Sequence, residues 1–279
     1  MNAFKLPRQK KQRGISLFIV IIFVMLSMLL ALWASRTSLF NELIVGNDAD
    51  YQRAFEAAQA ILQDAELDIR GENADGSFCI PSSSDGNICR RTTPEKIPLE
   101  AQEVGILLAD LADSNKIPDT SPKCKNGICI KRSDRPAIKD KQDFWNNSDS
   151  TKGITLAQMT GVHADNTTPV GARYGQFTGA AIGDDDNPAS AILRDRSAAN
   201  QGAWYWIEIL PYDESSKNSG VLVNDTSTGT GTNAINPKKI LALNLTPNIV
   251  YRITAIAYGR KPNTMVVLQQ TYARQKLKD

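Results

Sequence analysis

Residues 15–34 read ISLFIVIIFVMLSMLLALWA, an apolar run without a charged side chain. An α-helix rises about 1.5 Å per residue, so this run covers roughly 30 Å, the thickness of the hydrocarbon core of a bilayer. Five Lys and Arg residues precede the run, and no acidic residue occurs before Glu42. Because Lys and Arg favour the cytoplasmic side, the sequence predicts one membrane-spanning helix with its N-terminus inside and the rest of the chain exported.

A cleaved secretory signal fits this segment poorly. Such signals have an apolar core of about 7–15 residues followed by a small-residue cleavage site. Here the run is longer, and residues 32–36 (Leu-Trp-Ala-Ser-Arg) continue into another helical pattern. The candidate processing point lies before the run, at Gly14, and a plain uncleaved membrane anchor is the simplest alternative.

The motif Arg13-Gly14-Ile15-Ser16-Leu17-Phe18-Ile19 before an apolar helix resembles the class III signal of type IV pilins, which a prepilin peptidase cuts after Gly. The chain is most similar to minor pilins of the PilX family. The matching blocks are Arg36–Ser38, Gly46-Asn47, Ala54–Ala60, Gln63–Glu66, Tyr251–Ala255, Gly259–Thr264 and Val266–Gln269. They lie within about the first 70 and the last 30 residues, and the middle of the chain resembles no family.

The resemblance implies an α+β, pilin-like fold in which a long N-terminal helix, with a membrane-spanning lower half, packs on an antiparallel sheet head with long loops. It divides the chain into a leader (1–14), a spine helix (15–70) and a periplasmic head (71–279) with a loop-rich insertion at about 131–239. Cleavage between Gly14 and Ile15 would leave a single-pass inner-membrane subunit that later joins the pilus at the cell surface.

By the same resemblance, the chain would be a non-enzymatic minor pilin that helps to prime the pilus and is placed at or near its tip. The pilus would serve twitching motility, adhesion or DNA uptake. The implied partners are other minor pilins, the major pilin, a PilY-type tip adhesin and the prepilin peptidase. The alternatives are a type II secretion minor pseudopilin and a membrane-anchored periplasmic receptor or enzyme.

One position departs from the major pilins, which carry Glu at the fifth mature residue. That position is Ile19 here. The pilin-like subunit that caps the type II secretion pseudopilus also lacks this Glu, so Ile19 suggests tip placement. The alternative is sequence drift in a rare subunit.

The charge of the chain argues against a nucleic-acid partner. The formal net charge is +2, and loss of the five leader cations leaves −3. A dedicated nucleic-acid binder requires a basic surface instead. Roughly 245 residues follow the apolar run, which is enough for one well-buried domain.

Four cysteines, Cys79, Cys89, Cys124 and Cys129, form an even set in a chain predicted to be exported. An oxidising periplasm permits disulfides, and three pairings are possible. We favour Cys79–Cys89 and Cys124–Cys129, because each pair brackets turn residues. A zinc site is the alternative, but neither spacing is CxxC and His163 is the only histidine.

Beyond the membrane run, apolar residues recur at three- and four-residue steps and predict one buried helix face. They are Tyr51, Phe55, Ala58, Leu62, Ala65 and Ile69, whereas Asp64 falls outside this stripe. Since no proline lies between Pro7 and Pro81, the helix can continue to about Arg70, with Gly46-Asn47-Asp48 as its one expected loosened turn.

The head is predicted to contain strands and long loops. Aromatic and β-branched runs predict strands at 203–210, 240–245, 251–258 and 265–272, the last two as a hairpin. A short helix is expected at 101–112. Residues 131–200 and 213–239 read as loops, of which the second is an interaction region or a tolerated insertion.

The sequence offers little chemistry. His163 would have to carry any Ser-His-Asp triad alone, no GxSxG motif is present, and a solvated histidine is the simpler interpretation. Asp184-Asp185-Asp186-Asn187 and Asn73–Gly76 could supply oxygens to Ca²⁺, but Ser82 stands where a calcium loop needs Glu. We therefore expect solvated turns there, no cofactor and no catalytic residues.

Overall fold

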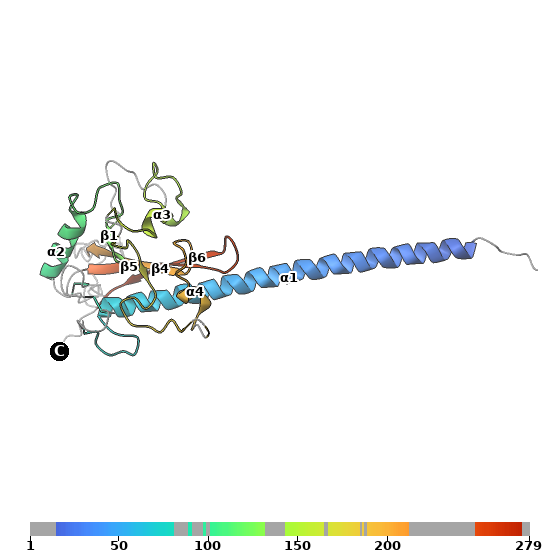
Figure 1. The fold of residues 1–279 in the computed structure, drawn as a ribbon, viewed down its shortest axis with the longest axis horizontal. Coiled ribbons are helices and arrows are strands. Elements are labelled where there is room, and N and C mark those ends of the chain that lie inside the picture. The colour runs from blue at the N-terminus through green and yellow to red at the C-terminus, as the bar shows by residue number, and fades with distance from the viewer. Residues whose placement is uncertain are drawn as a thin grey trace, which may run out of the picture. The chain divides into compact units, whose positions relative to one another are not determined.

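The computed structural model describes residues 15–80, 89–90, 97–98, 101–131, 143–164, 167–184, 186, 189–211 and 249–274 (Figure 1). The leader, the expected strand at 240–245 and the loop 213–239 lie outside this described part. The chain divides into two compact units, residues 1–49 and 50–279. Helix α1 (Ile15–Arg70) contributes its first half to one unit and its second half to the other.

Helix α1 is continuous through Gly46-Asn47-Asp48. The loosened turn expected at these residues is therefore wrong. One glycine in a helix interior costs only about 1 kcal/mol, which the apolar and alanine-rich turns on both sides outweigh.

The described part of the head contains one six-stranded sheet. Its strands are β1 (Cys124–Lys125), β2 (Ile128–Ile130), β3 (Ala172–Arg173), β4 (Ala203–Pro211), β5 (Ile249–Tyr258) and β6 (Met265–Tyr272). The order is β1-β2-β4-β5-β6, with β3 also paired to β4. The predicted hairpin is confirmed, since β5 and β6 pair antiparallel from Tyr251–Tyr272 to Tyr258–Met265.

The sheet departs from the expected antiparallel pattern at one place, where β2 pairs parallel to β4. A parallel pair needs a crossover connection rather than a tight turn. The long stretch between β2 and β4 supplies one, and it contains the short helices η1 (Phe144–Asn146), α3 (Leu156–Met159) and α4 (Ala191–Arg194). The predicted helix at 101–112 is confirmed as α2 (Ala101–Ala112).

Successive residues of β4 point to opposite faces of the sheet. Tyr205 and Ile207 lie in the core cluster that contains α1 and α2. Trp204 and Trp206 lie in the cluster on the other face, with Phe144, Met159 and the second disulfide. Because both faces are covered, β4 is apolar almost throughout instead of alternating with polar residues.

The second half of α1 packs on the first face through small side chains, which allow close approach to the sheet. Its buried apolar residues are Ala54, Ala57, Ala58, Ile61, Leu62, Ala65 and Ile69. The predicted stripe is therefore confirmed in its later turns, but Tyr51 is 49% exposed and Asp64 is buried. Asp64 can be buried because it has hydrogen-bond partners in the head.

Candidate functional site

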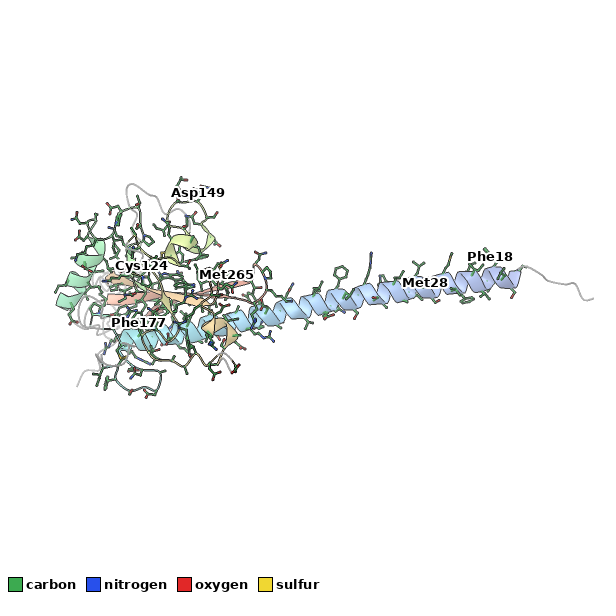
Figure 2. All side chains as sticks on the ribbon, viewed as in Figure 1. Phe18, Met28, Cys124, Asp149, Phe177 and Met265 are labelled. Atoms are coloured by element: carbon green, nitrogen blue, oxygen red, sulfur yellow. A yellow bond between two sulfur atoms is a disulfide. The ribbon has the colours of Figure 1, made fainter. Side chains whose placement is uncertain are left out.

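The first half of α1 carries a continuous exposed apolar surface. From Ile15 to Val45 its large apolar side chains are between 43% exposed (Ile22) and 72% exposed (Trp33). Figure 2 shows Phe18 and Met28 projecting from this half of the helix. It is the one helix in the described part that is long and apolar enough to cross a membrane. A helix that is apolar on all sides requires a bilayer or other helices around it.

The predicted processing site lies at the start of this helix. Ile15 is the first residue of α1 and is 65% exposed, whereas Gly14 lies outside the described residues. Ile19 is 46% exposed on the next turn. In the described part, no acidic residue occurs on α1 before Glu42. Residues 15–34 therefore present only apolar and hydroxyl side chains to whatever surrounds them.

The second half of α1 is fastened to the head by buried carboxylates. Asp50, 2% exposed, accepts hydrogen bonds from the backbone N–H groups of Arg260 at 2.9 Å and Lys261 at 3.0 Å. Burial raises the pKa of Asp50, but these two N–H bonds, together with the Thr264 side chain and the charge of Lys261, outweigh burial and hold the pKa below its ordinary value. Asp50 thus fixes the β5–β6 turn onto the helix.

Asp64 joins α1 to the loop after β3. It is 2% exposed and accepts hydrogen bonds from the Gly175 N–H at 2.8 Å and from the Thr178 hydroxyl. Burial outweighs these bonds and raises the pKa of Asp64 to about 6. The Asp64 carboxylate therefore holds the loop after β3 against α1, although removing its charge from water is unfavourable.

Asp68 lies one turn further along and forms a buried ion pair with Arg90. Arg90 Nε lies 2.7 Å from Asp68 Oδ1 and Nη2 lies 2.7 Å from Oδ2, with side chains 4% and 2% exposed. The Tyr205 hydroxyl of β4 donates to Asp68 Oδ2 at 2.8 Å. Burial and then the neighbouring Asp68 carboxylate raise the pKa of Tyr205 well above its ordinary value, so the phenol keeps its proton and acts as a donor.

The four cysteines form two disulfides, Cys79–Cys89 and Cys124–Cys129. This is the pairing favoured by the turn residues between the members of each pair. Neither pair is available to zinc, and the described part of the chain contains no group of His, Cys, Asp and Glu that could hold a metal ion.

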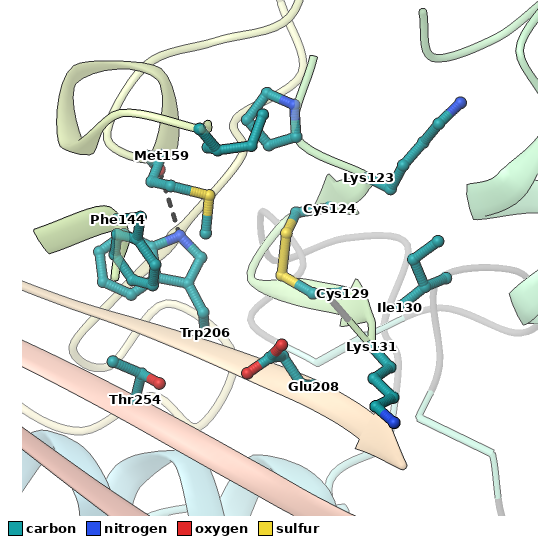
Figure 3. Close-up of a pocket in the computed structure, with 12 residues that line it drawn as sticks. Lys123, Cys124, Cys129, Ile130, Lys131, Phe144, Met159, Trp206, Glu208 and Thr254 are labelled. Atoms are coloured by element: carbon teal, nitrogen blue, oxygen red, sulfur yellow. Dashed lines mark hydrogen bonds between the residues drawn. A yellow bond between two sulfur atoms is a disulfide. The ribbon is translucent and has the colours of Figure 1, made fainter. Parts of the chain in front are cut away.

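A small apolar cavity lies beside the second disulfide. Figure 3 shows Cys124–Cys129 facing Phe144, Met159 and Trp206, whose indole N–H donates to the Met159 carbonyl at 3.1 Å. The cavity holds about 20 Å³, which is room for about one water molecule. It is a packing defect of the core rather than a ligand pocket.

The remaining candidates for chemistry are structural. The ring Nε2 of His163 contacts the Cys124 carbonyl at 2.5 Å. Asp75 accepts from the N–H and hydroxyl of Ser77, which closes a turn. Asp184 and Asp186 are described, but the acidic run 184–187 is not described in full, so the expectation of a solvated turn there falls partly outside the described residues.

Sequence reasoning missed three residues of the junction between α1 and the sheet: Asp50, Asp68 and Arg90. One signal was available, because Asp64 and Asp68 are four residues apart and therefore share a helix face. That face also carries buried alanines, where an acidic pair needs partners in the fold.

The fold and the exposed helix together define a protein with a globular head and a helix that is long and apolar enough to anchor it in a membrane. Residues 112–274 match the family model described as type IV pilus assembly protein PilX C-term, and residues 13–63 match the PilX N-terminal model. The first match covers most of the middle of the chain, so the expectation that the middle resembles no family is wrong. The chain therefore belongs to the PilX family of type IV pilus assembly proteins, whose role is structural rather than catalytic. No match was found among curated proteins or among solved structures.

Proposed function

We propose that this chain is a minor pilin that primes type IV pilus assembly and is incorporated at or near the pilus tip. The observation that carries the proposal is the first half of α1, which is apolar on all sides from Ile15 to Ala34 and exposed as far as Val45. Such a surface is stable only in a bilayer or in a bundle of similar helices. A pilin occupies both environments in turn.

In this mechanism, prepilin peptidase cleaves between Gly14 and Ile15. The helix 15–34 then holds the subunit in the inner membrane, with the head in the periplasm. Small side chains at Ser16, Ser27 and Ala31 permit close approach of neighbouring helices. The first such bundle forms the seed from which the pilus grows.

Ile19 supports a place above the other subunits. In major pilins, the Glu at this position neutralises the N-terminal amine of a neighbouring subunit. Ile19 has no charge to offer, so this chain does not require such a neighbour. The absence of a carboxylate also makes membrane residence easier, since an acid at the bilayer centre costs about 3 kcal/mol on insertion scales.

The expected partners are other minor pilins, the major pilin and a PilY-type adhesin at the tip. The alternatives are a pseudopilin of type II secretion and a membrane-anchored receptor or enzyme. Membership of the PilX family supports the pilus over both alternatives.

Intact-mass spectrometry of the chain extracted from membranes tests the processing step. We expect a protein that begins at Ile15 with a methylated amine. A Gly14→Val variant, in which the small residue before the cut is enlarged, should keep the leader. A wild-type protein that retains Lys5 to Arg13 would contradict the proposal.

A second experiment tests tip placement. Ile19→Glu introduces the carboxylate of a subunit that packs under another, and Ile22→Glu places the same charge about one turn later as a control. We expect Ile19→Glu to reduce the number of pili or to move the protein along the filament, relative to Ile22→Glu. Unchanged pilus number and unchanged position for Ile19→Glu would refute the placement.

A further inference from the structure

The Cys79–Cys89 disulfide determines where Arg90 can lie, because Arg90 follows Cys89 directly in the chain. Cys79 is itself fixed to the end of α1, since its N–H donates to the Gly71 carbonyl at 2.9 Å. The disulfide therefore connects the C-terminal end of the spine helix to the residue whose guanidinium pairs with Asp68.

Arg90 is the point at which three other segments meet. Its guanidinium pairs with Asp68 of α1, and Nη2 also donates to the Asn126 carbonyl in the β1–β2 turn at 2.8 Å. Its Cζ lies 3.6 Å from the centre of the Phe177 ring, in the loop that Asp64 holds. Loss of Arg90 from this place would loosen all three contacts together.

The charges around Asp68 make Arg90 necessary. Tyr205 supplies a neutral hydrogen bond, and Asp64 is a second buried acid on the preceding turn. Without Arg90, Asp68 would lose its guanidinium partner, whereas Asp64 would keep its own hydrogen bonds and the neighbouring charge of Arg196. Removal of one partner of a buried ion pair is strongly destabilising, because the other charge stays buried and unpaired.

We propose that Cys79–Cys89 is an oxidation-dependent latch for the docking of α1 on the sheet, acting through Arg90. The latch is the disulfide together with the Arg90–Asp68 pair. Its closure converts two thiols into one S–S bond and releases two protons and two electrons, which reduce a disulfide oxidant of the cell envelope to its dithiol. The reduced chain holds Arg90 less often on Asp68, so the helix docks weakly until oxidation.

The latch predicts that the disulfide and Arg90 act as one unit. The test measures amide hydrogen exchange at Ile61 and Ala65, buried in the docked half of α1, in the full chain in detergent micelles. Cys79→Ala/Cys89→Ala and Arg90→Met should each raise these exchange rates by about tenfold or more. The combined variant should be within about twofold of the larger single effect. If the two effects multiply, the disulfide is an independent crosslink and the latch is overturned.

Arg252→Met provides the control, because it removes another Arg–carboxylate pair, in which Arg252 Nε lies 2.7 Å from Glu208 Oε2. The Glu208 side chain is buried, and that of Arg252 is 31% exposed. Its effect on exchange should multiply with that of the double-alanine variant, since Arg252 has no link to this disulfide. If the effects of Arg252→Met and the double-alanine variant also fail to multiply, coupling in this assay is not specific to Arg90, and the latch is overturned.

A reciprocal measurement needs no cysteine variant and therefore does not depend on their folding. If the disulfide favours the ion pair, the ion pair protects the disulfide by the same factor. Arg90→Met should raise the equilibrium constant for reduction of Cys79–Cys89 by dithiothreitol by about tenfold, whereas Arg252→Met leaves it within about twofold. An unchanged constant in Arg90→Met would overturn the latch. Both measurements use the purified chain, so their outcome is independent of whether the chain enters a pilus.

Discussion

Replacement of Asp64 by Asn should remove one pH-dependent contribution to the free energy of unfolding of the head. Asn keeps the shape of the side chain, its carbonyl can still accept from the Gly175 N–H, and its amide can donate to the Thr178 hydroxyl. Only the charge is lost. The variant therefore isolates the cost of ionising this acid between helix and sheet.

The magnitude follows from the shift of the pKa. Asp64 has an ordinary pKa of 3.8, and burial, opposed by its two hydrogen bonds and by Arg196 and reinforced by Asp68, raises the pKa to about 6. Between these two values the native state binds the proton more tightly than the unfolded state does. The free energy of unfolding therefore falls as pH rises through this window, by about 3 kcal/mol in total.

The assay is chemical unfolding of the full chain in detergent micelles between about pH 3.5 and about pH 7. The stability of the wild type minus that of Asp64→Asn should fall by about 3 kcal/mol as pH rises, with nearly all of the change below about pH 6.5. Other acids titrate equally in both proteins and cancel in the difference. A difference that is constant with pH, or one that rises, would refute the assignment of the raised pKa to desolvation of Asp64.

Two further predictions concern the head. Asp50→Ala leaves the N–H groups of residues 260–261 without their acceptor, so it should lower the free energy of unfolding by about 1–3 kcal/mol and speed hydrogen exchange at those two amides. Asp48 is exposed, and Asp48→Ala should change neither quantity. Gly127→Ala should lower the free energy of unfolding by at least about 2 kcal/mol, as measured by thermal unfolding, because φ is +81° and the new Cβ would lie 2.6 Å from a Cβ atom of β3. Gly105→Ala in α2 is the control. Its new Cβ meets no atom within 4 Å, so it should stabilise the protein by about 0.5–1 kcal/mol.

The elements that could be predicted from the sequence are those governed by local pattern. The apolar run and the stripe after it define α1, and the two β-rich runs around residues 259–264 define the β5–β6 hairpin. In each case, neighbouring residues along the chain carry the information. The bounds of α2 follow from the same kind of periodicity.

What could not be predicted depends on partners far apart in the chain. From the sequence, Asp64 is expected to face solvent, because a carboxylate outside an apolar stripe is usually exposed. It is buried because the loop after β3 supplies hydrogen-bond donors to its carboxylate. The parallel β2–β4 pair is hidden for the same reason, since a three-residue strand has little pattern of its own. Arg90 lies in a segment with no periodicity, so its pairing with Asp68 has no local signature.

The two halves of α1 differ in where their contacts are made. From Ile15 to residue 41 the helix carries no acidic side chain and has no buried residue, so nothing within the described chain satisfies its surface. From Asp50 onward, three buried carboxylates each bind a different part of the head, so this half is satisfied internally. Association with a bilayer or with other apolar helices can therefore replace the surroundings of the first half without competing with the contacts that hold the second. Under the proposed function, this separation allows the subunit to pass from membrane to filament while its head stays folded.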